Sequence, residues 1–338
     1  MTMKSRYDIA PLGLQRIRTY ALGKRKSKVT VRDFARPLGG TVLARGATVR
    51  ALLDSLPRIL AADDLRAVVR AVADARRKHH AVVWGIGGHV IKCGLGPVLN
   101  DLIRRGYVTG LAMNGAALVH DFEVALVGNT SEDVEAGLGG GQFGMAEETG
   151  LLLNEIAVGA ARSGIGLGEA AGKLLANPRI GAKHLDASVL AAAWQARVPV
   201  TVHLAIGADI PHMHPSVDGA ALGAASHHDF RLFCALVKRM HPGGAYLNWG
   251  SAVILPEVFL KAVSVVRNLG TPLHPITTAN FDFLQHYRPL MNVVRRPTQG
   301  AAGKGQESRS RGYALTGHHE LMLPLFAAAL VDAQRRRP

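Results

Sequence analysis

The stretch LAMNGAALVHDFEVALVGNTSEDVEAGLGGGQFGMAEETG, residues 111–150, decides the fold prediction for this chain. Residues 108–113 are mostly apolar and predict a strand, and Asn114-Gly115 supplies a turn into a helix that starts near Ala116. A helix start exposes unpaired N–H groups and a partial positive charge, so this junction favours an anionic group such as a pyrophosphate. On a simpler interpretation, Asn-Gly is only a turn.

A polar pair, His120-Asp121, follows within the predicted helix. An imidazole beside a carboxylate offers hydrogen-bonding groups that orient a ribose or a substrate amine. The alternative interpretation is an ordinary pair on the protein surface.

A second strand, turn and helix lie earlier in the chain. Residues 81–86 form a short apolar run, Gly87-Gly88-His89 follows it, and residues 90–105 have helical spacing. The number of residues between this turn and Asn114-Gly115 is typical of a helical connection between neighbouring strands of a parallel sheet. Two such turns at the carboxyl ends of neighbouring strands form a crevice for a ligand.

Two later segments continue the alternation of strands and helices. Residues 198–204 predict a buried strand shortly before Asp209, whose carboxylate is well placed for a cationic group. Residues 245–255 predict a strand interrupted by the turn Gly250-Ser251. This alternation predicts an α/β fold with a parallel sheet. The remaining predicted segments are helices in 48–79, 147–176, 230–240 and 257–268, a strand-to-loop passage at 271–282, a mobile segment at 297–312, and a final helix at 320–335.

Length and composition are those of an α/β enzyme. The 338 residues are 48% hydrophobic and include 38 glycines. Residues 1–45 predict a basic N-terminal arm with a short strand at 28–31, and residues 46–338 predict one α/β domain. No apolar run reaches the length of a membrane span, and the N-terminus lacks the apolar segment of a signal peptide. Two cysteines exclude a disulfide framework, which favours the cytoplasm.

The formal net charge of +15 is concentrated in the predicted tails and loops. Neither a nucleic-acid recognition motif nor a series of aromatic stacking residues accompanies it. The charge therefore favours a solvated or oligomer-contacting surface over a nucleic-acid partner.

His212 and His214 raise a metal hypothesis, because extended backbone points both imidazoles of a His-x-His motif the same way. The nearby candidates are His203, His227, His228 and Asp229. A third ligand at a fixed spacing is missing, so no metal is predicted, and ordinary loop histidines are the alternative.

Four passages resemble deoxyhypusine synthase, the enzyme family that moves an aminobutyl group from spermidine to a lysine of a translation factor. They are GGHVIKCGLGPVLNDLIRRGYVTGLAMNGAALVHDFEVAL, PVTVHLAIGADI, YLNWGSAVILPEV and ITTANFDF, and their order and spacing agree with the family over residues 80–330. The resemblance is to a divergent, bacterial-type member. It implies a Rossmann-like, doubly wound parallel sheet with helices on both faces, NAD as cofactor, and a homotetramer.

The resemblance also implies site residues. Asp209 matches a carboxylate that holds the polyamine. The implied cofactor-binding residues are Asn114, Gly115 and Ala116 in the NAD turn, Gly88 with His89 at an earlier asparagine, His120 in place of a glutamate with Asp121 beside it, Gly250 and Ser251 at a glycine turn, and Asp282 near a cofactor aspartate.

Two family residues are replaced in this chain. The position of the active-site histidine falls at Pro256, with Glu257 next, and the segment 292–297 holds arginines where the family has its lysine. Lys304, in the segment predicted to be mobile, is the candidate to compensate. A covalent imine needs an unprotonated amine, which arginine does not supply.

The sequence therefore predicts an NAD-dependent transferase that acts on a polyamine or another small amine. The expected reaction is dehydrogenation and aminoalkyl transfer by a route other than the lysine imine, with Asp209 and Glu257 as catalytic residues. The alternatives are a non-catalytic or regulatory nucleotide-binding homologue, and a metal-assisted hydrolase that uses His212 and His214.

Overall fold

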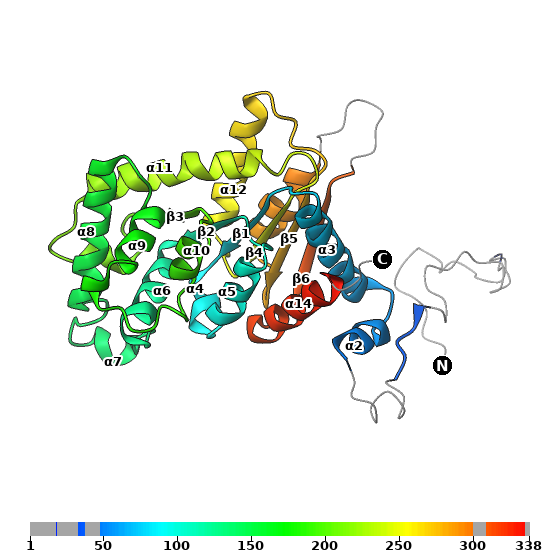
Figure 1. The fold of residues 1–338 in the computed structure, drawn as a ribbon, viewed down its shortest axis with the longest axis horizontal. Coiled ribbons are helices and arrows are strands. Elements are labelled where there is room, and N and C mark those ends of the chain that lie inside the picture. Colours follow the sequence, from blue (N-terminus) through cyan, green and yellow to red (C-terminus); the bar gives the residue numbers. More distant parts are fainter. Residues whose placement is uncertain (1–17, 19–32, 38–47, 300–308, 335–338) are drawn as a thin grey trace, which may run out of the picture.

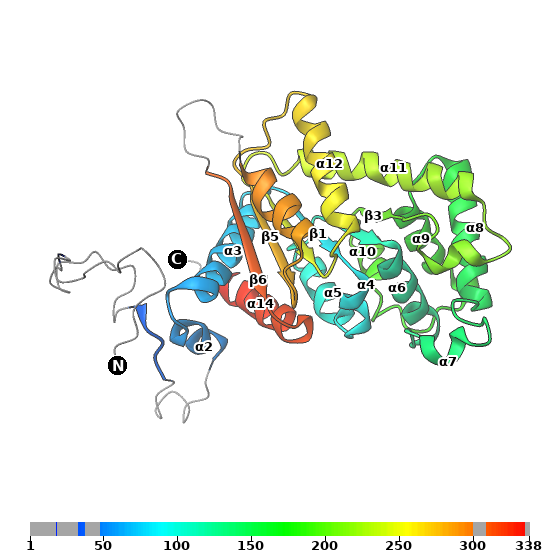
Figure 2. The ribbon, with the colours of Figure 1, turned by 180° about the vertical axis from the view of Figure 1, so that it is seen from behind.

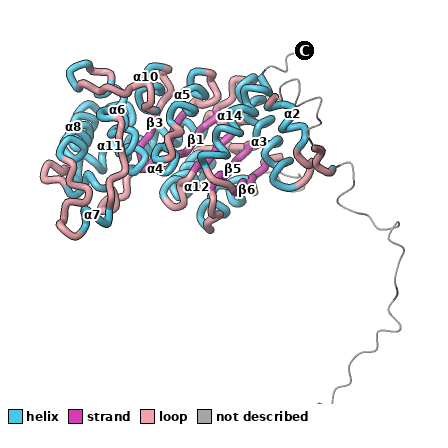
Figure 3. The backbone as a smooth tube through the Cα atoms, turned by 90° about the horizontal axis from the view of Figure 1, so that it is seen from below, coloured by secondary structure: helices cyan, strands magenta, loops and turns pink. Residues whose placement is uncertain are grey.

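The computed structural model describes residues 18, 33–37, 48–299 and 309–334. In this part of the chain, a six-stranded parallel sheet has the order β3-β2-β1-β4-β5-β6. The strands are β1 (Val82–Ile86), β2 (Gly110–Asn114), β3 (Val200–His203), β4 (Ala245–Trp249), β5 (Thr277–Asp282) and β6 (Arg311–Thr316). Helices lie on both faces of the sheet (Figure 3). The predicted doubly wound α/β fold is confirmed.

A hydrophobic core lies on each face of the sheet. Successive strand residues face opposite sides, so Trp84 of β1 packs in the larger core and Val83 in the smaller one. The larger core also contains residues of α3 (Leu60–Arg77), α5 (Gly96–Arg104) and α14 (His319–Gln334). The smaller core contains residues of α11 (Gly219–Lys238) and α12 (Ile254–Asn268).

Half of the remaining helices belong to the long connection between β2 and β3. Figures 1 and 2 show α7, α8 and α9 at the end of the molecule opposite α2. The helices of this connection are α6 (Gly115–Val127), α7 (Val134–Leu138), α8 (Glu147–Ser163), α9 (Leu167–Leu175), η3 (Pro178–Ile180) and α10 (Val189–Gln195). The others are α2 (Val49–Ser55), α4 (Gly88–Lys92), η4 (Ile210–Met213), α13 (Tyr287–Pro289), η5 (Leu290–Arg295) and η6 (Arg296–Thr298).

The strand order reverses between β1 and β4. The chain runs outward from β1 through β2 to β3, and β4 then returns to the other side of β1. The connections at these two strands leave in opposite directions, so their carboxyl ends flank a crevice, which is the general ligand-binding position of open α/β sheets.

Two predicted elements are corrected by the structure. The expected helix at 90–105 is divided into α4 and α5, because Gly94 has φ +72° and Pro97 lies in the first turn of α5. Of the segment 297–312, predicted to be mobile, residues 300–308 lie outside the described part of the chain, but residues 311–312 begin β6, which pairs with β5 along its whole length. Nearly all of the predicted N-terminal arm, with its strand at 28–31, lies outside the described residues.

None of the described helices combines the length and apolar character needed to cross a membrane.

Candidate functional site

Three glycine-containing turns predicted from the sequence meet at the carboxyl edge of the sheet. Gly87, Asn114 and Gly250 follow or end the adjacent strands β1, β2 and β4. The Gly87 N–H donates a hydrogen bond to the carbonyl oxygen of Trp249 at 2.8 Å. A Cβ atom on Gly87 would overlap with the backbone of Gly250, so this approach of two turns requires glycine.

The turn after β1 also touches the first turn of α6. A Cβ atom on Gly88 would lie 3.0 Å from the Cβ of Ala116 and 3.0 Å from the Cδ2 of His120. Asn114 is the N-cap of α6, and its Oδ1 accepts a hydrogen bond from the Ala117 N–H at 2.9 Å. The Asn114 side-chain amide makes no other hydrogen bond with the described residues, so its N–H donors are free to bind a ligand.

Asp209 lies against the start of α6 from the loop after β3. A Cβ atom on Gly115 would overlap with the Asp209 carboxylate, and Asp209 Oδ2 accepts a hydrogen bond from the Ala205 N–H at 3.0 Å. Burial raises the pKa of Asp209, and the Ala205 N–H and His212 act in the opposite direction. The structure therefore places a half-buried carboxylate at the edge of the predicted turn.

A cavity of about 200 Å³ opens beside this carboxylate. Most of its lining comes from the stretch 111–150, with α4 and the loop after β3 supplying the rest. The lining residues are Lys92, Ala116, Val119, His120, Glu123, Ser131, Glu132, Val134, Phe143, Ala208, Asp209 and Ile210. Three carboxylates face one lysine, so the cavity favours a cationic guest. Sequence reasoning did not find Glu123 and Glu132, because nothing in their local pattern distinguishes them from surface residues.

The crevice between β1 and β4 contains a histidine that the sequence analysis missed. His319 begins α14 and is 1% exposed, and its ring packs over Gly250. Its Nε2–H donates to the carbonyl oxygen of Phe281 at 3.2 Å, and its Nδ1 is buried without a hydrogen-bond partner. Burial lowers the pKa of His319, so the ring is neutral and Nδ1 is an acceptor. The sequence offered one clue to His319, its position just after a strand. The sequence analysis did not predict that strand, β6.

Rings and polar groups surround His319 at the crevice. The His89 ring lies 5.5 Å from that of His319 and 5.7 Å from that of Phe283, and His89 and Phe283 are both exposed. Asp282 is buried at the end of β5, where its Oδ1 accepts the Phe283 N–H at 2.9 Å. Ser251 is also buried, and its Oγ accepts the Leu255 N–H at 3.2 Å. The structure thus brings the predicted residues His89, Ser251 and Asp282 to this edge of the sheet.

Asp121 does not face the crevice or the cavity. It is completely buried, and its carboxylate accepts hydrogen bonds from Ser188 Oγ at 2.7 Å, Val189 N at 2.7 Å and Leu190 N at 2.9 Å. These donors form the first turn of α10, so Asp121 caps that helix instead of contacting a cofactor.

Replacing Asp121 with alanine is expected to destabilise the fold by about 3 kcal/mol, because three buried donors lose their acceptor. Urea unfolding measures this change, and Asp101→Ala, at an exposed carboxylate paired with Arg105, is the control. A loss below about 1 kcal/mol would show that Asp121 does not hold α10.

Glu257 does not share the cavity of Asp209. Its carboxylate is bound by Lys261, by Arg288 Nε at 3.3 Å and by Asn292 Nδ2 at 2.8 Å, and it does not line the cavity. These contacts lower the pKa of Glu257, with the hydrogen bond from Lys261 contributing most. A carboxylate held between two cations is an anchor for α12 and α13, so the structure does not support the predicted catalytic role beside Asp209.

The histidine motif near β3 is not extended, contrary to the assumption of the metal hypothesis. His212 lies in the 3₁₀ helix η4 and accepts the Gly207 N–H at Nδ1, while His214 contacts Ser216 and Glu147. Asp229 is buried elsewhere, where it accepts backbone hydrogen bonds from Val202 and Gly168. Within the described ranges, no group of three or more His, Cys, Asp or Glu residues is arranged to hold a metal ion.

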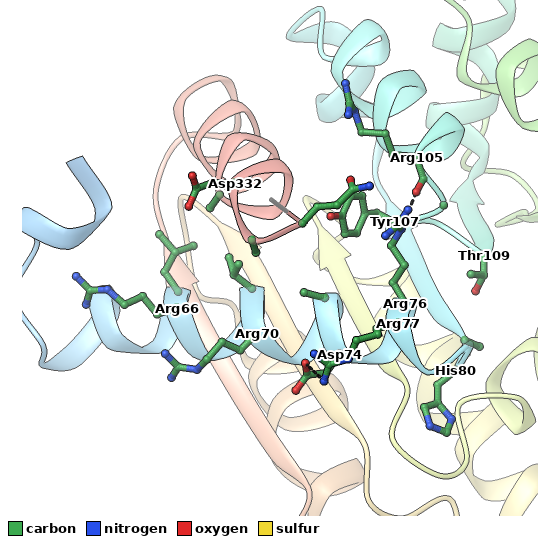
Figure 4. Close-up of a pocket in the computed structure, with 18 of the residues that line it drawn as sticks. Arg66, Arg70, Asp74, Arg76, Arg77, His80, Arg105, Tyr107, Thr109 and Asp332 are labelled. Atoms are coloured by element: carbon green, nitrogen blue, oxygen red, sulfur yellow. Dashed lines mark hydrogen bonds and ion pairs between the residues drawn. The ribbon is translucent and has the colours of Figure 1, made fainter. Parts of the chain in front are cut away.

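A larger hollow, of about 1460 Å³, lies along α3 near the amino ends of the strands (Figure 4). Arginines dominate its lining, but several are bound to backbone carbonyls. Arg66 donates to the carbonyls of Leu53 and Leu56 at the end of α2, and Arg76 donates to that of Arg105 and covers the Tyr107 ring. These contacts satisfy helix C-termini, which attract positive charge. None of the predicted site residues lines this hollow.

Comparisons with known proteins show likeness to several solved structures. No family model and no curated protein matches the chain. A candidate deoxyhypusine synthase from Entamoeba histolytica is 11% identical with a TM-score of 0.45, covering 85% of this chain and 94% of that one. A conserved protein of the LOR/SDH type from Methanococcus maripaludis is 14% identical with a TM-score of 0.43, covering 80% and 69%.

A third similar structure is AgrE in a ternary complex with ornithine and NAD⁺. It is 16% identical with a TM-score of 0.46, and the match covers 83% of this chain. This chain spans about one third of AgrE, 35% of its length. These likenesses concern the fold, and none of them assigns a substrate or a cofactor to this chain.

Proposed function

We propose that this protein is an NAD-dependent enzyme that dehydrogenates a small amine or polyamine and transfers an aminoalkyl group. The observation that carries the proposal is the contact between two sites. The crevice at the strand reversal, with its glycine turns and His319, adjoins the acidic cavity of Asp209 through Gly88, Ala116 and His120. A dinucleotide in the first site and an amine in the second would place a hydride acceptor beside a C–H bond next to nitrogen.

An unpaired polar atom at the crevice fits a dinucleotide. His319 Nδ1 is a buried acceptor without a hydrogen-bond partner, and its ring lies over Gly250. A bound nicotinamide ring or ribose carries amide N–H or hydroxyl groups that can donate to such an acceptor. The free side-chain amide of Asn114 adds a donor for a phosphate oxygen. NAD would supply the hydride acceptor, and these residues would orient it.

The cavity fits the amine. Asp209 would hold the cationic nitrogen, because its half-buried carboxylate has no ion pair with the described residues and a bound ammonium would supply one. Lys304 of the predicted mobile segment lies outside the described residues, and the described segment at 292–297 contains no lysine. Because the segment 292–297 lacks a lysine, the reaction is proposed to proceed without an enzyme imine. The acceptor amine would add directly to the carbon–nitrogen double bond of the dehydrogenated donor, the rest of the donor would leave as an amine, and the hydride would return to the product. The homotetramer and the cytoplasmic location remain predictions.

The cofactor assignment is tested by Asn114→Asp. The carboxylate keeps the N-cap hydrogen bond of α6, so the fold is retained, but it removes an N–H donor and brings a negative charge towards the pyrophosphate. We expect NAD⁺ binding to weaken by roughly 1–3 kcal/mol in a calorimetric titration. Asn114→Ser, a neutral cap without the side-chain amide, is the matched control for loss of the amide without an added charge. Equal NAD⁺ affinity in the wild type and in Asn114→Asp would reject the assignment.

The same titration separates the function classes. An enzyme of the proposed type binds NAD⁺ and reduces it when a suitable amine from a panel is added. Binding of NAD⁺ without reduction by any amine would favour the regulatory homologue. Absence of NAD⁺ binding at millimolar concentration would overturn the proposed function altogether.

A further inference from the structure

We propose that His120 is the specificity-determining residue for a primary ammonium group in the cavity, acting through an Nε2 lone pair that Thr130 and Glu123 hold in place. The inference rests on the proposed function, because it names the substrate class of the same site. It assigns a role to this side chain that differs from the cofactor contact implied by the sequence resemblance.

The hydrogen bonds around His120 fix its tautomer. Thr130 Oγ1 donates to Glu123 Oε2 at 2.6 Å, and Thr149 Oγ1 donates to Glu123 Oε1 at 3.1 Å. An ionised carboxylate only accepts, so the single hydroxyl hydrogen of Thr130 is committed to Glu123. The Thr130 oxygen then accepts from His120 Nδ1–H at 2.7 Å. In the neutral ring, Nε2 therefore carries the lone pair.

The His120 imidazole is neutral at physiological pH. Burial, followed by the nearby positive charge of Lys92, lowers the pKa of His120 to about 4. A neutral ring does not repel a cation, and no hydrogen bond with the described residues engages Nε2. His120 lines the cavity, so a guest there meets an unoccupied acceptor.

The cavity matches an ammonium head group in its acceptors and size. An alkylammonium carries three N–H donors. Asp209 and Glu132 offer carboxylate oxygens, and His120 adds a neutral acceptor of fixed direction. Glu132 is itself fixed by accepting the Gly144 N–H at 2.7 Å. A space of about 200 Å³ admits one end of an alkylamine, with the rest extending towards the crevice or solvent. Full methylation removes all three donors and enlarges the head group, so the site discriminates against quaternary ammonium ions.

The threonine gives a matched pair of test variants. Thr130→Val keeps the shape but removes the hydroxyl, so His120 Nδ1 loses its partner and the ring is free to adopt the other tautomer. Thr130→Ser keeps the hydroxyl. The probe is n-butylammonium chloride, with the N,N,N-trimethyl analogue as comparison, titrated by calorimetry into the full-length protein saturated with NAD⁺ and, separately, without it.

We expect butylammonium to bind at least tenfold more tightly than its trimethyl analogue. Thr130→Val should remove most of that preference, and Thr130→Ser should keep it. Nitrogen-15 NMR of labelled histidine should show His120 protonated at Nδ1 in the wild type and in Thr130→Ser, with a mixture of tautomers in Thr130→Val.

Equal binding of the two amines, or an Nε2-protonated His120 in the wild type, would overturn the inference. Normal NAD⁺ binding in such a protein would leave the proposed function standing. If the wild-type protein prefers butylammonium but does not bind NAD⁺, the proposed function is overturned, and the role of His120 in selecting the ammonium group stands.

Discussion

Replacing Asp209 with asparagine is expected to lower the turnover of any amine substrate by about a thousandfold and to leave NAD⁺ affinity within a fewfold of the wild type. The thousandfold figure corresponds to about 4 kcal/mol, the range measured when one partner of a buried ion pair is removed. Asparagine keeps an oxygen that accepts the Ala205 N–H, so the loop after β3 is retained. Only the charge that would hold the ammonium is lost.

A second variant reaches the same carboxylate from the opposite side. Gly115→Ala places a methyl group where the Asp209 carboxylate lies, so the carboxylate must move. The backbone of Gly115 needs no positive φ, and the effect is therefore one of displacement and not of backbone strain. Steady-state kinetics with NAD⁺ reduction as the signal should show the same loss as Asp209→Asn, and thermal unfolding checks that both variants fold. Normal turnover in Asp209→Asn would exclude the amine-binding role.

Raising the pH from 5 to 8 is expected to destabilise the fold through Asp229, by about 3 kcal/mol. Asp229 is completely buried on α11, and burial raises its pKa to about 7. The ordinary pKa of an aspartic acid side chain is 3.8, so between pH 3.8 and 7 the folded protein holds a proton that the unfolded chain releases. The contribution of Asp229 to the free energy of unfolding is therefore greatest below pH 4 and is lost as the pH rises towards 7.

Asp229→Asn isolates this contribution. Asp229 Oδ2 accepts the N–H groups of Val202 and Gly168, and an amide oxygen can take the same place. The pKa values of His120 and His203 are lowered by burial to about 4 and about 3, so these rings act in the opposite sense below pH 6.5. The difference between wild type and Asp229→Asn in urea unfolding cancels their effect. That difference should grow in favour of the variant by about 1.4 kcal/mol per pH unit between pH 5 and 7. A difference that does not change with pH would show that Asp229 has an ordinary pKa.

The sequence by itself determined the fold class and the position of the turns. Apolar runs that end in Gly87-Gly88 or Asn114-Gly115 are local signals, because strand burial, glycine conformations and helix capping each depend on a few consecutive residues. The spacing of these two turns predicted that β1 and β2 are parallel neighbours, and the two strands are adjacent in the sheet. Asp209 was identified from the same local pattern, at the end of a buried strand.

Only the tertiary structure decided which side chains meet. Asp121 caps α10 some 67 residues later in the chain, and His319 reaches the turn of Gly250 only because β6 joins the edge of the sheet. Thr130 and Glu123 fix the His120 ring only because the chain after α6 turns back towards that helix. Short-range periodicity carries no information about such contacts, since the order of strands and the packing of helices across the sheet set them.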